Sequence, residues 1–468
     1  MVKSILIDEP QFKSTEDRLH NSSLQSDIGL IIGKINPNLD RAFIFDLIPT
    51  PSNDNGQPPS SLSSITKSSK SKSKSQSESL LLDTDWISEH ANQVSQMLLG
   101  GVNVIGIYIW SPESSFSSSN ASIFQVIKGV ADATPARGTS NDYIIVHFCY
   151  SPRKLVVRSC VPGSSSLRIC EFKLGRVLSS LRRFKCLYNF EMQLPITKGG
   201  GSFRDVVNNA ITRHGKELNG AKALVDGDIV FDDRLESVEG LHNVEMLLPV
   251  MRDCVGETKD EVIGVVVFRG FVCSYAYLNP KESVEQAISD IKRDIIMSLQ
   301  SRLNIMCDEV EEDVGSGENT EEVSGERSIT QIELQLLKKP TRLAFPRRVL
   351  VPWIGDVFIC DYLQPSDTFG VVQDHCKELL SWEVPADSSL ILEPEKEAIS
   401  LATKTFWDVV VPKNLPSASD SNSMVTRGND TMQMEGNKAS VLSANLNTIF
   451  AIAILILAIV IGFLFYRL

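Results

Sequence analysis

Apolar side chains recur along the first 175 residues in a pattern that predicts alternating strands and helices. Short apolar runs bounded by glycine or polar residues are typical of buried strands, and they occupy residues 29–33, 42–48, 102–109, 143–149, 155–160 and 167–172. Residues 83–99 and 122–130 instead repeat apolar positions at the spacing of an amphipathic helix. The predicted inward side chains of the first helix are Trp86, Ile87, His90, Val94, Met97 and Leu98. This order predicts an α/β (α+β) domain over residues 1–175.

A second alternating block covers residues 176–307. It predicts strands at residues 187–194 and 244–250, and a helix at residues 203–217 with Ser202 as its N-cap. The second region is therefore also of the α/β class.

Two segments of the chain resemble each other in sequence. Residues 266–283 align with residues 351–368, and both stretches have the pattern of a strand, a glycine turn, a strand and then a helix, at residues 284–299 and 369–380. This is either a duplicated hairpin and helix, which would be a structural unit, or a chance match between two amphipathic hairpins.

Three stretches lack the apolar content that folding requires. Residues 49–79 are rich in Ser, Pro and Lys, residues 308–328 are acidic, and residues 412–443 are polar throughout. We predict a disordered insert, an acidic linker and a flexible tether, respectively. These leave residues 329–411 as a separate hairpin and helix region.

Residues 449–465 form an uncharged apolar run that approaches the length of a membrane-spanning helix. At ~1.5 Å per residue the run covers roughly 26 Å, which suits a thin bilayer such as that of the endoplasmic reticulum (ER). The alternative is a buried core helix, but such a helix normally keeps a polar face. The predicted anchor side chains are Ile449, Phe450, Leu455, Ile456, Leu457, Ile461, Phe463 and Phe465.

The position of this run predicts a tail anchor. Only residues 466–468 follow it, and residues 1–23 lack the apolar core of a signal peptide. We therefore expect a single-pass protein with a cytosolic N-terminal body, where the nine cysteines stay reduced. Arg467 favours the ER, with the outer mitochondrial membrane as the alternative.

Charge and composition argue against two classes of function, nucleic-acid binding and thiol-protease catalysis. The net charge of −12 comes largely from residues 308–328, and no strongly basic segment suggests a nucleic-acid partner. Neither the pair His375 and Cys376 nor His147 has the pattern of a nucleophile and its base, because those normally come from separate segments. We predict a core position for Cys376, a surface position for His375 and a packing role for His147, with no cofactor.

The order of elements in the first domain resembles the MPN domain, the fold of the JAMM deubiquitinating metalloproteases and of their inactive partners. The resemblance rests on four segments. They are Gly-Leu-Ile-Ile-Gly at residues 29–33, the end of the next strand with Ile-Pro-Thr-Pro at residues 48–51, the helix from Asp83, and Val-Ile-Gly-Ile-Tyr-Ile-Trp-Ser-Pro at residues 104–112. An unrelated α/β domain with a glycine-flanked buried strand is the alternative.

The resemblance implies a lost zinc site. Gly106, Tyr108, Pro112 and Ser119 match the motif of the active members, but the two histidine positions fall on Ile109 and Ser111. The aspartate position falls on Ser122, and the position of the general-base glutamate falls on Ser26, next to Asp27. Isoleucine offers no ligand atom and hydroxyls bind zinc poorly beside imidazole and carboxylate. We predict a pseudo-enzyme with no catalytic or metal residues.

Most of the chain, excepting the linkers, resembles the odorant-response-abnormal protein four (Odr-four) family. The residues that carry this resemblance are 26–51, 86–112 and 186–196, together with the hydrophobic tail. The resemblance implies an ER-membrane adaptor or chaperone-like factor that supports the maturation and trafficking of multi-pass membrane receptors. It also implies recruitment of the cysteine protease specific for the ubiquitin-fold modifier, in the pathway called ufmylation.

Two other functions remain as alternatives. One is a hydrolase of ubiquitin-like conjugates with an unorthodox site. The other is a tail-anchored fusion or tethering factor, which would need a coiled coil next to its anchor, and residues 412–443 contain no heptads.

Overall fold

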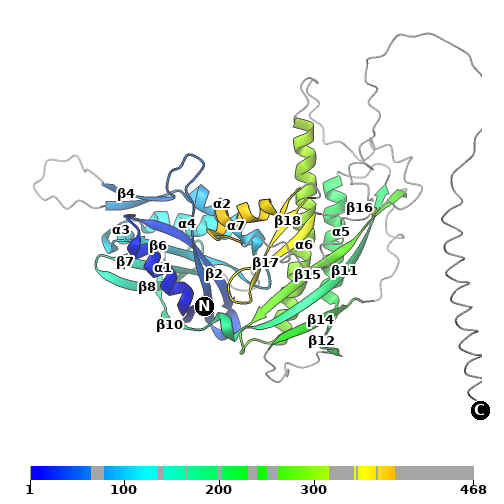
Figure 1. The fold of residues 1–468 in the computed structure, drawn as a ribbon, viewed down its shortest axis with the longest axis horizontal. Helices are drawn as coiled ribbons and strands as arrows, with labels where there is room; N and C mark the ends of the chain where they lie inside the picture. Colours follow the sequence, from blue (N-terminus) through cyan, green and yellow to red (C-terminus); the bar gives the residue numbers. More distant parts are fainter. Residues whose placement is uncertain are drawn as a thin grey trace, which may run out of the picture. The chain divides into compact units, whose positions relative to one another are not determined.

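The computed structural model describes most of the chain up to residue 384. The described residues are 2–64, 78–134, 142–164, 166–197, 203–229, 240–249, 262–315, 342–343, 346–364 and 367–384. They belong to one compact unit, residues 1–413, and they form the mixed α/β fold that the sequence predicts (Figure 1).

An eight-stranded mixed sheet forms the N-terminal part, in the order β10-β1-β3-β2-β6-β7-β8-β9. Its strands are β1 (Ser4–Asp8), β2 (Asp27–Asn36), β3 (Arg41–Pro49), β6 (Asn103–Ser111), β7 (Tyr143–Tyr150), β8 (Arg153–Cys160), β9 (Arg168–Ile169) and β10 (Glu171–Gly175). Strands β6 and β7 run parallel, so their carboxyl ends meet at one edge of the sheet.

Helices cover both faces of this sheet. On one face α1 (Glu9–Asn21) contributes Phe12 and Leu19 to a cluster with Tyr108 and Phe148. The other face packs against the helices α2 (Thr84–Met97), α3 (Glu113–Ser118) and α4 (Asn120–Ala133). Because both faces are covered, the central strand β6 is apolar almost throughout, which explains why its sequence shows a run rather than an alternation.

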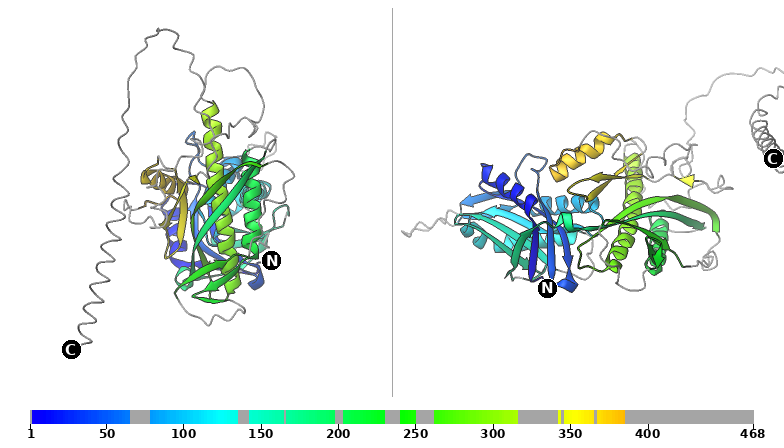
Figure 2. Two further views of the ribbon diagram at one scale, coloured as in Figure 1. Left: turned by 90° about the vertical axis from the view of Figure 1, so that its right-hand side faces the viewer. Right: turned by 60° about the horizontal axis from the view of Figure 1, so that its bottom comes forward.

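A second, six-stranded sheet has the order β13-β12-β14-β11-β15-β16. Its strands are β11 (Arg182–Thr197), β12 (Lys222–Val225), β13 (Asp228–Ile229), β14 (Leu241–Leu247), β15 (Val262–Leu278) and β16 (Arg342–Leu343). The helices α5 (Phe203–Gly220) and α6 (Val284–Gly315) lie along one face of this sheet (Figure 2). Their apolar side chains are buried with those of β11 and β15.

The predicted hairpin repeat is wrong in its first copy, residues 266–283. Strand β15 continues without a turn through Gly270, where a Cβ would lie 2.9 Å from the ring of Phe190. Glycine is needed there for close approach, whereas Gly355 has a φ of +57° and lies in a real turn between β17 (Arg347–Pro352) and β18 (Phe358–Leu363). The predicted helix starts are confirmed, since α6 begins at Val284 and α7 spans Phe369–Leu380.

Strands β17 and β18 and helix α7 extend the N-terminal core. Val351, Ile359 and Val372 belong to the same buried cluster as Ile87 of α2 and Ile107 of β6. Helix α7 lies beside α2 (Figure 1).

Two stretches that composition predicts to be unfolded contain structure. Strand β4 (Ser60–Ser64) lies within residues 49–79 and pairs with β5 (Glu78–Leu82). Leu80 of β5 is buried in the N-terminal core and donates its amide to Ser119 Oγ at 2.7 Å. Within residues 308–328, α6 continues to Gly315, since glutamate is a good helix former despite its charge. Strand β1 and helix α1 were not predicted at all.

Among the described residues, none of the helices is both long enough and apolar enough to span a bilayer. The predicted tether at 412–443 and the predicted anchor at 449–465 lie outside the described residues.

Candidate functional site

The four positions that the resemblance assigns to a lost zinc site do not form a ligand set. Ile109 is fully buried among apolar side chains on the α2 and α4 side of the sheet. Ser26 lies just before β2, where its hydroxyl accepts a hydrogen bond from Ser60 Oγ at 3.2 Å. Ser122 lies in α4 and is half-buried. With no donor atom at Ile109, these residues do not fit a catalytic zinc ion, which needs three protein ligands.

Asp27, the neighbour of Ser26, already has two side-chain partners. Its Oδ2 lies 3.0 Å from Nη1 of Arg18 and 3.2 Å from the hydroxyl of Tyr108. Burial and the Asp27 carboxylate raise the pKa of Tyr108 well above its ordinary value, so this phenol stays protonated. Tyr108 and Ile109 point to opposite faces of β6. The Asp27 carboxylate therefore makes its contacts on the face covered by α1, away from the face of Ile109.

Ser111 contacts a histidine of the neighbouring strand. It is fully buried at the end of β6, and its Oγ lies 3.2 Å from Nε2 of His147. The parallel register places His147 of β7 beside Ile109, so a histidine reaches this face from the neighbouring strand. The sequence assigned His147 a packing role, because strand pairing cannot be read from a single segment.

Buried charges connect the N-terminal sheet to helix α6. Lys34 of β2 donates from Nζ to Asp290 Oδ2 at 2.7 Å and to the carbonyl of Tyr277 at 3.0 Å. The side-chain amide of Asn36 donates to Glu282 Oε1 at 3.0 Å. Buried charges are tolerated only when they are paired, so this network fixes the two sheets in one arrangement.

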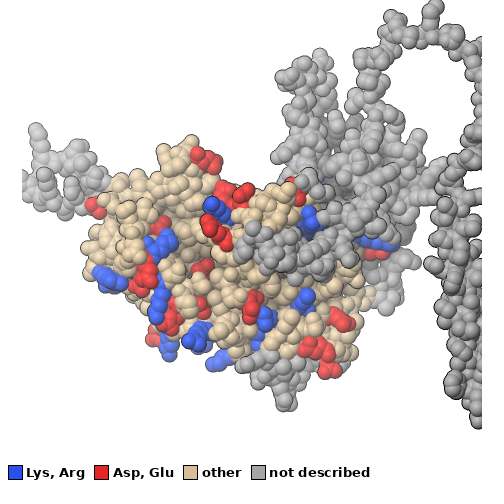
Figure 3. Space-filling model, viewed as in Figure 1, with Lys and Arg blue, Asp and Glu red and all other residues tan. Residues whose placement is uncertain are grey.

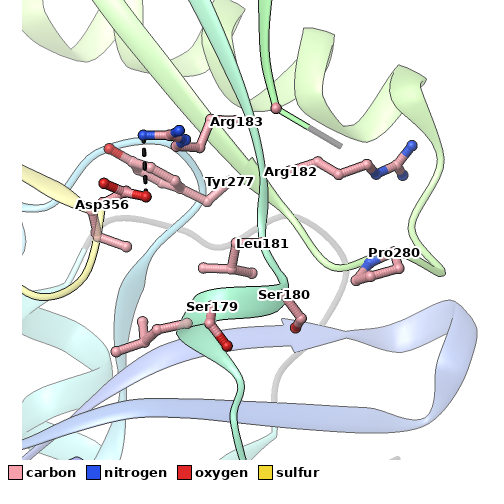
Figure 4. Close-up of a pocket in the computed structure, with 11 residues that line it drawn as sticks. Ser179, Ser180, Leu181, Arg182, Arg183, Tyr277, Pro280 and Asp356 are labelled. Atoms are coloured by element: carbon pink, nitrogen blue, oxygen red, sulfur yellow. Dashed lines mark ion pairs between the residues drawn. The ribbon is translucent and has the colours of Figure 1, made fainter. Parts of the chain in front are cut away.

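A pocket of about 690 Å³ lies where β11 begins, bordered by the turn between β17 and β18. Arg183 Nη1 pairs with Asp356 Oδ2 at 3.3 Å across it, and Arg182 points away from that pair (Figure 4). The described residues that line it include Ser179 and Ser180 but no histidine or cysteine. These lining residues therefore offer neither serine an imidazole base.

The face of the six-stranded sheet opposite α5 and α6 exposes large apolar side chains. Leu187 is 48% exposed, Phe271 44%, Leu241 46% and Leu247 42%. An ion pair between Arg269 Nε and Glu191 Oε2, at 2.7 Å, lies on the same two long strands. Elsewhere, basic and acidic residues are interspersed over the described part of the surface shown in Figure 3.

Comparison with known proteins gives relatives over most of the chain. A Dictyostelium discoideum protein named "Protein odr-4 homolog" is 24% identical over 80% of this chain and 79% of its own length. The human protein of the same name is 26% identical over 68% of this chain and 73% of its own length. Among solved structures, the crystal structure of UfSP from C. elegans matches with a TM-score of 0.39 and 10% identity, covering 85% of this chain and 60% of that chain.

The family comparison covers the described domain from β2 onward and extends past α7. The sequence model of the ODR4-like family, described as "Odorant response abnormal 4-like", matches residues 29–391. Since this match spans well over half of the chain, the protein belongs to the ODR4-like family.

Proposed function

We propose that this protein is a non-enzymatic, tail-anchored adaptor of the ER membrane. Residues 449–465 hold it in the bilayer, and the folded residues lie on the cytosolic side. The adaptor supports the maturation and trafficking of multi-pass receptors and recruits the cysteine protease specific for the ubiquitin-fold modifier. The family's description, which refers to odorant response, supports the link to receptors.

One observation carries the non-enzymatic part of this proposal. Where the resemblance to the MPN metalloproteases places the first histidine, the chain buries Ile109 completely in an apolar cluster. An α/β domain that keeps its core but has no ligands there retains a use as a binding surface.

We assign to the protease partner the exposed part of the sheet face opposite α5 and α6. Tyr275 and Tyr277 of the same face are buried in the N-terminal core and lie outside this surface. Leu187 and Phe271 lie on the two long antiparallel strands β11 and β15, close to the pair of Arg269 and Glu191. Exposed apolar side chains beside charged ones are the composition of protein interfaces, with an apolar centre and a polar rim.

Co-purification from detergent-solubilised ER membranes tests the proposal. We expect the full chain to recover the protease, and the variant Leu187→Asp with Phe271→Asp to lose it while still reaching the membrane. The matched control is Ile169→Asp with Leu174→Asp, which places the same two charges at exposed positions of the other sheet. Failure of the full chain to recover any protease of the modifier pathway would refute the recruitment role.

Deletion of residues 449–468 tests the location separately. The truncated chain should become cytosolic and should still bind the protease in solution. A truncated chain that stays on membranes would contradict the tail anchor without affecting the binding surface.

The alternative function, a hydrolase of ubiquitin-like conjugates, lacks a comparable observation. It would need a zinc ion that depends on Asp27 or Ser122. The Asp27 carboxylate is already paired with Arg18 on the opposite face from Ile109.

A further inference from the structure

Three side chains with metal-binding atoms converge at the carboxyl ends of β6 and β7. Glu113, His147 and Cys149 place a carboxylate oxygen, an imidazole nitrogen and a thiol sulfur within 4.8 Å of one another. His147 and Cys149 lie two positions apart on the same face of β7, and Glu113 opens α3 directly after Pro112. None of the three is explained by the adaptor role.

The imidazole of His147 is oriented as in a metal ligand. Its Nε2 lies 3.1 Å from the carbonyl oxygen of Ser111. Since a carbonyl only accepts, Nε2 carries the proton and Nδ1 has a free lone pair. Metal-binding histidines commonly donate their second N–H to a backbone carbonyl in this way, which fixes the tautomer and the ring.

That lone pair has no hydrogen-bond partner although the side chain is completely buried. Nδ1 of His147 is unpaired, and the nearest charged atom is Glu113 Oε2 at 3.8 Å. The ring of Phe116 stacks on the imidazole with centroids 4.1 Å apart and holds it in place. Buried polar atoms are almost always paired, so this nitrogen points to a missing ligand.

The spacing and the donor types fit zinc. Bonds of about 2.0–2.3 Å at tetrahedral angles place neighbouring ligand atoms about 3.3–3.7 Å apart. The three atoms lie within 4.8 Å of one another, so they must approach by roughly 1 Å to bind the ion. Sulfur, imidazole nitrogen and carboxylate oxygen are also the three ligand types that zinc accepts. We propose that Glu113, His147 Nδ1 and Cys149 Sγ bind a zinc ion, with water as the fourth ligand.

Two cationic side chains lie beside the Glu113 carboxylate. Lys154 Nζ lies 2.9 Å from Glu113 Oε2, and Arg158 Nη2 lies 3.8 Å from Oε1. The Lys154 side chain is 42% exposed, so its ammonium group can move into solvent when the metal binds. Lys154 is therefore a competitor for the carboxylate and lowers the affinity for zinc without abolishing it.

The site lies one strand away from the lost protease site and has a structural consequence. A bound ion would tie β7 to the start of α3 at the point where the chain turns out of β6. The proposal is independent of the adaptor role, because the cluster lies on the N-terminal sheet and the assigned protein surface lies on the other sheet.

Metal analysis of the full chain in detergent tests the proposal with zinc, and then cobalt, as the probe. We expect about one equivalent of zinc per chain, and a thiolate-to-cobalt absorption band after substitution by Co²⁺. Cys149→Ser should remove the band, whereas Cys160→Ser, which alters a buried cysteine outside the cluster, should leave it unchanged.

Two surface variants keep the test independent of folding. Glu113→Gln, at a side chain 29% exposed, should weaken zinc binding by at least about 10- to 100-fold. Lys154→Met should strengthen zinc binding, and Arg153→Met, at a 70% exposed neighbour, should not change it. Zinc content that is negligible in the wild type, or that survives both Cys149→Ser and Glu113→Gln, would overturn the proposal.

Discussion

The guanidinium group of Arg348 and the carboxylate of Asp294 form a buried two-point contact. Nη1 donates to Oδ2 at 2.8 Å and Nη2 donates to Oδ1 at 2.7 Å, with the two side chains 1% and 6% exposed. Asp294 belongs to α6 and Arg348 to β17, so the pair joins the helix of the second sheet to the strand that completes the N-terminal core. Nη1 also donates to the carbonyl of Cys273 at 3.0 Å.

Removal of one member of this pair should destabilise the fold strongly. We expect Arg348→Met to lower the free energy of unfolding by about 3–5 kcal/mol, because it leaves a buried carboxylate without its partner. The double variant Arg348→Met with Asp294→Leu should recover most of that loss, since it leaves no buried charge. Chemical unfolding of the full chain in detergent measures both, and equal stability of the single and double variants would contradict this account.

Gly101 should not tolerate a side chain. It has a φ of +84°, and a Cβ there would collide with the carboxylate of Asp290, the partner of Lys34. Gly163 has a similar φ of +82° with nothing within 4 Å, which makes it the matched control. We expect Gly163→Ala to cost about 1 kcal/mol from backbone strain alone, and Gly101→Ala to cost about 1–3 kcal/mol more. Equal unfolding midpoints for the two variants would show that the Asp290 contact is unimportant.

His90 should make stability depend on pH. Its Nε2 donates to the carbonyl of Leu379 at 2.8 Å, Nδ1 lies 3.2 Å from Thr50 Oγ1, and burial lowers its pKa from 6.5 to about 4. Since the folded chain holds the neutral form, the stabilisation is complete above pH 6.5 and is lost as pH falls toward 4. The total effect of such a shift is about 3 kcal/mol.

The variant His90→Gln isolates this contribution. Its amide can donate to the Leu379 carbonyl but cannot titrate, so the unfolding free energy of the variant should fall less than that of the wild type between pH 7 and pH 4. Parallel curves for the two proteins, measured by chemical unfolding at each pH, would rule out His90 as the titrating group.

Restoring a single histidine should not restore a metal site at the end of β6. Ile109→His would place an imidazole among apolar side chains of α2 and α4, and we expect a loss of about 2–4 kcal/mol in stability. The variant should gain no zinc beyond the wild-type content in metal analysis. A stable Ile109→His protein with an additional equivalent of zinc would refute the pseudo-enzyme interpretation.

The pattern of apolar and polar residues predicted most of the helices and strands, because that pattern is set by residues close together in the sequence. Strand β6, helix α2 and the starts of α6 and α7 follow from apolar runs and helical spacing. Strand β1 and helix α1 escaped prediction, since a five-residue strand and a largely polar helix give weak patterns. Gly270 was misread as a turn because a glycine required for close approach looks the same in sequence as one required for positive φ.

The sequence by itself determined that Ile109 cannot bind a metal and that residues 449–465 are apolar enough to form an anchor. Both are properties of single segments and need no partner. Only the tertiary structure decided that His147 lies beside Ser111, that Cys149 and Glu113 join it, and that Arg348 pairs with Asp294. These contacts depend on strand register and on the packing of distant segments, which no local pattern of side chains specifies.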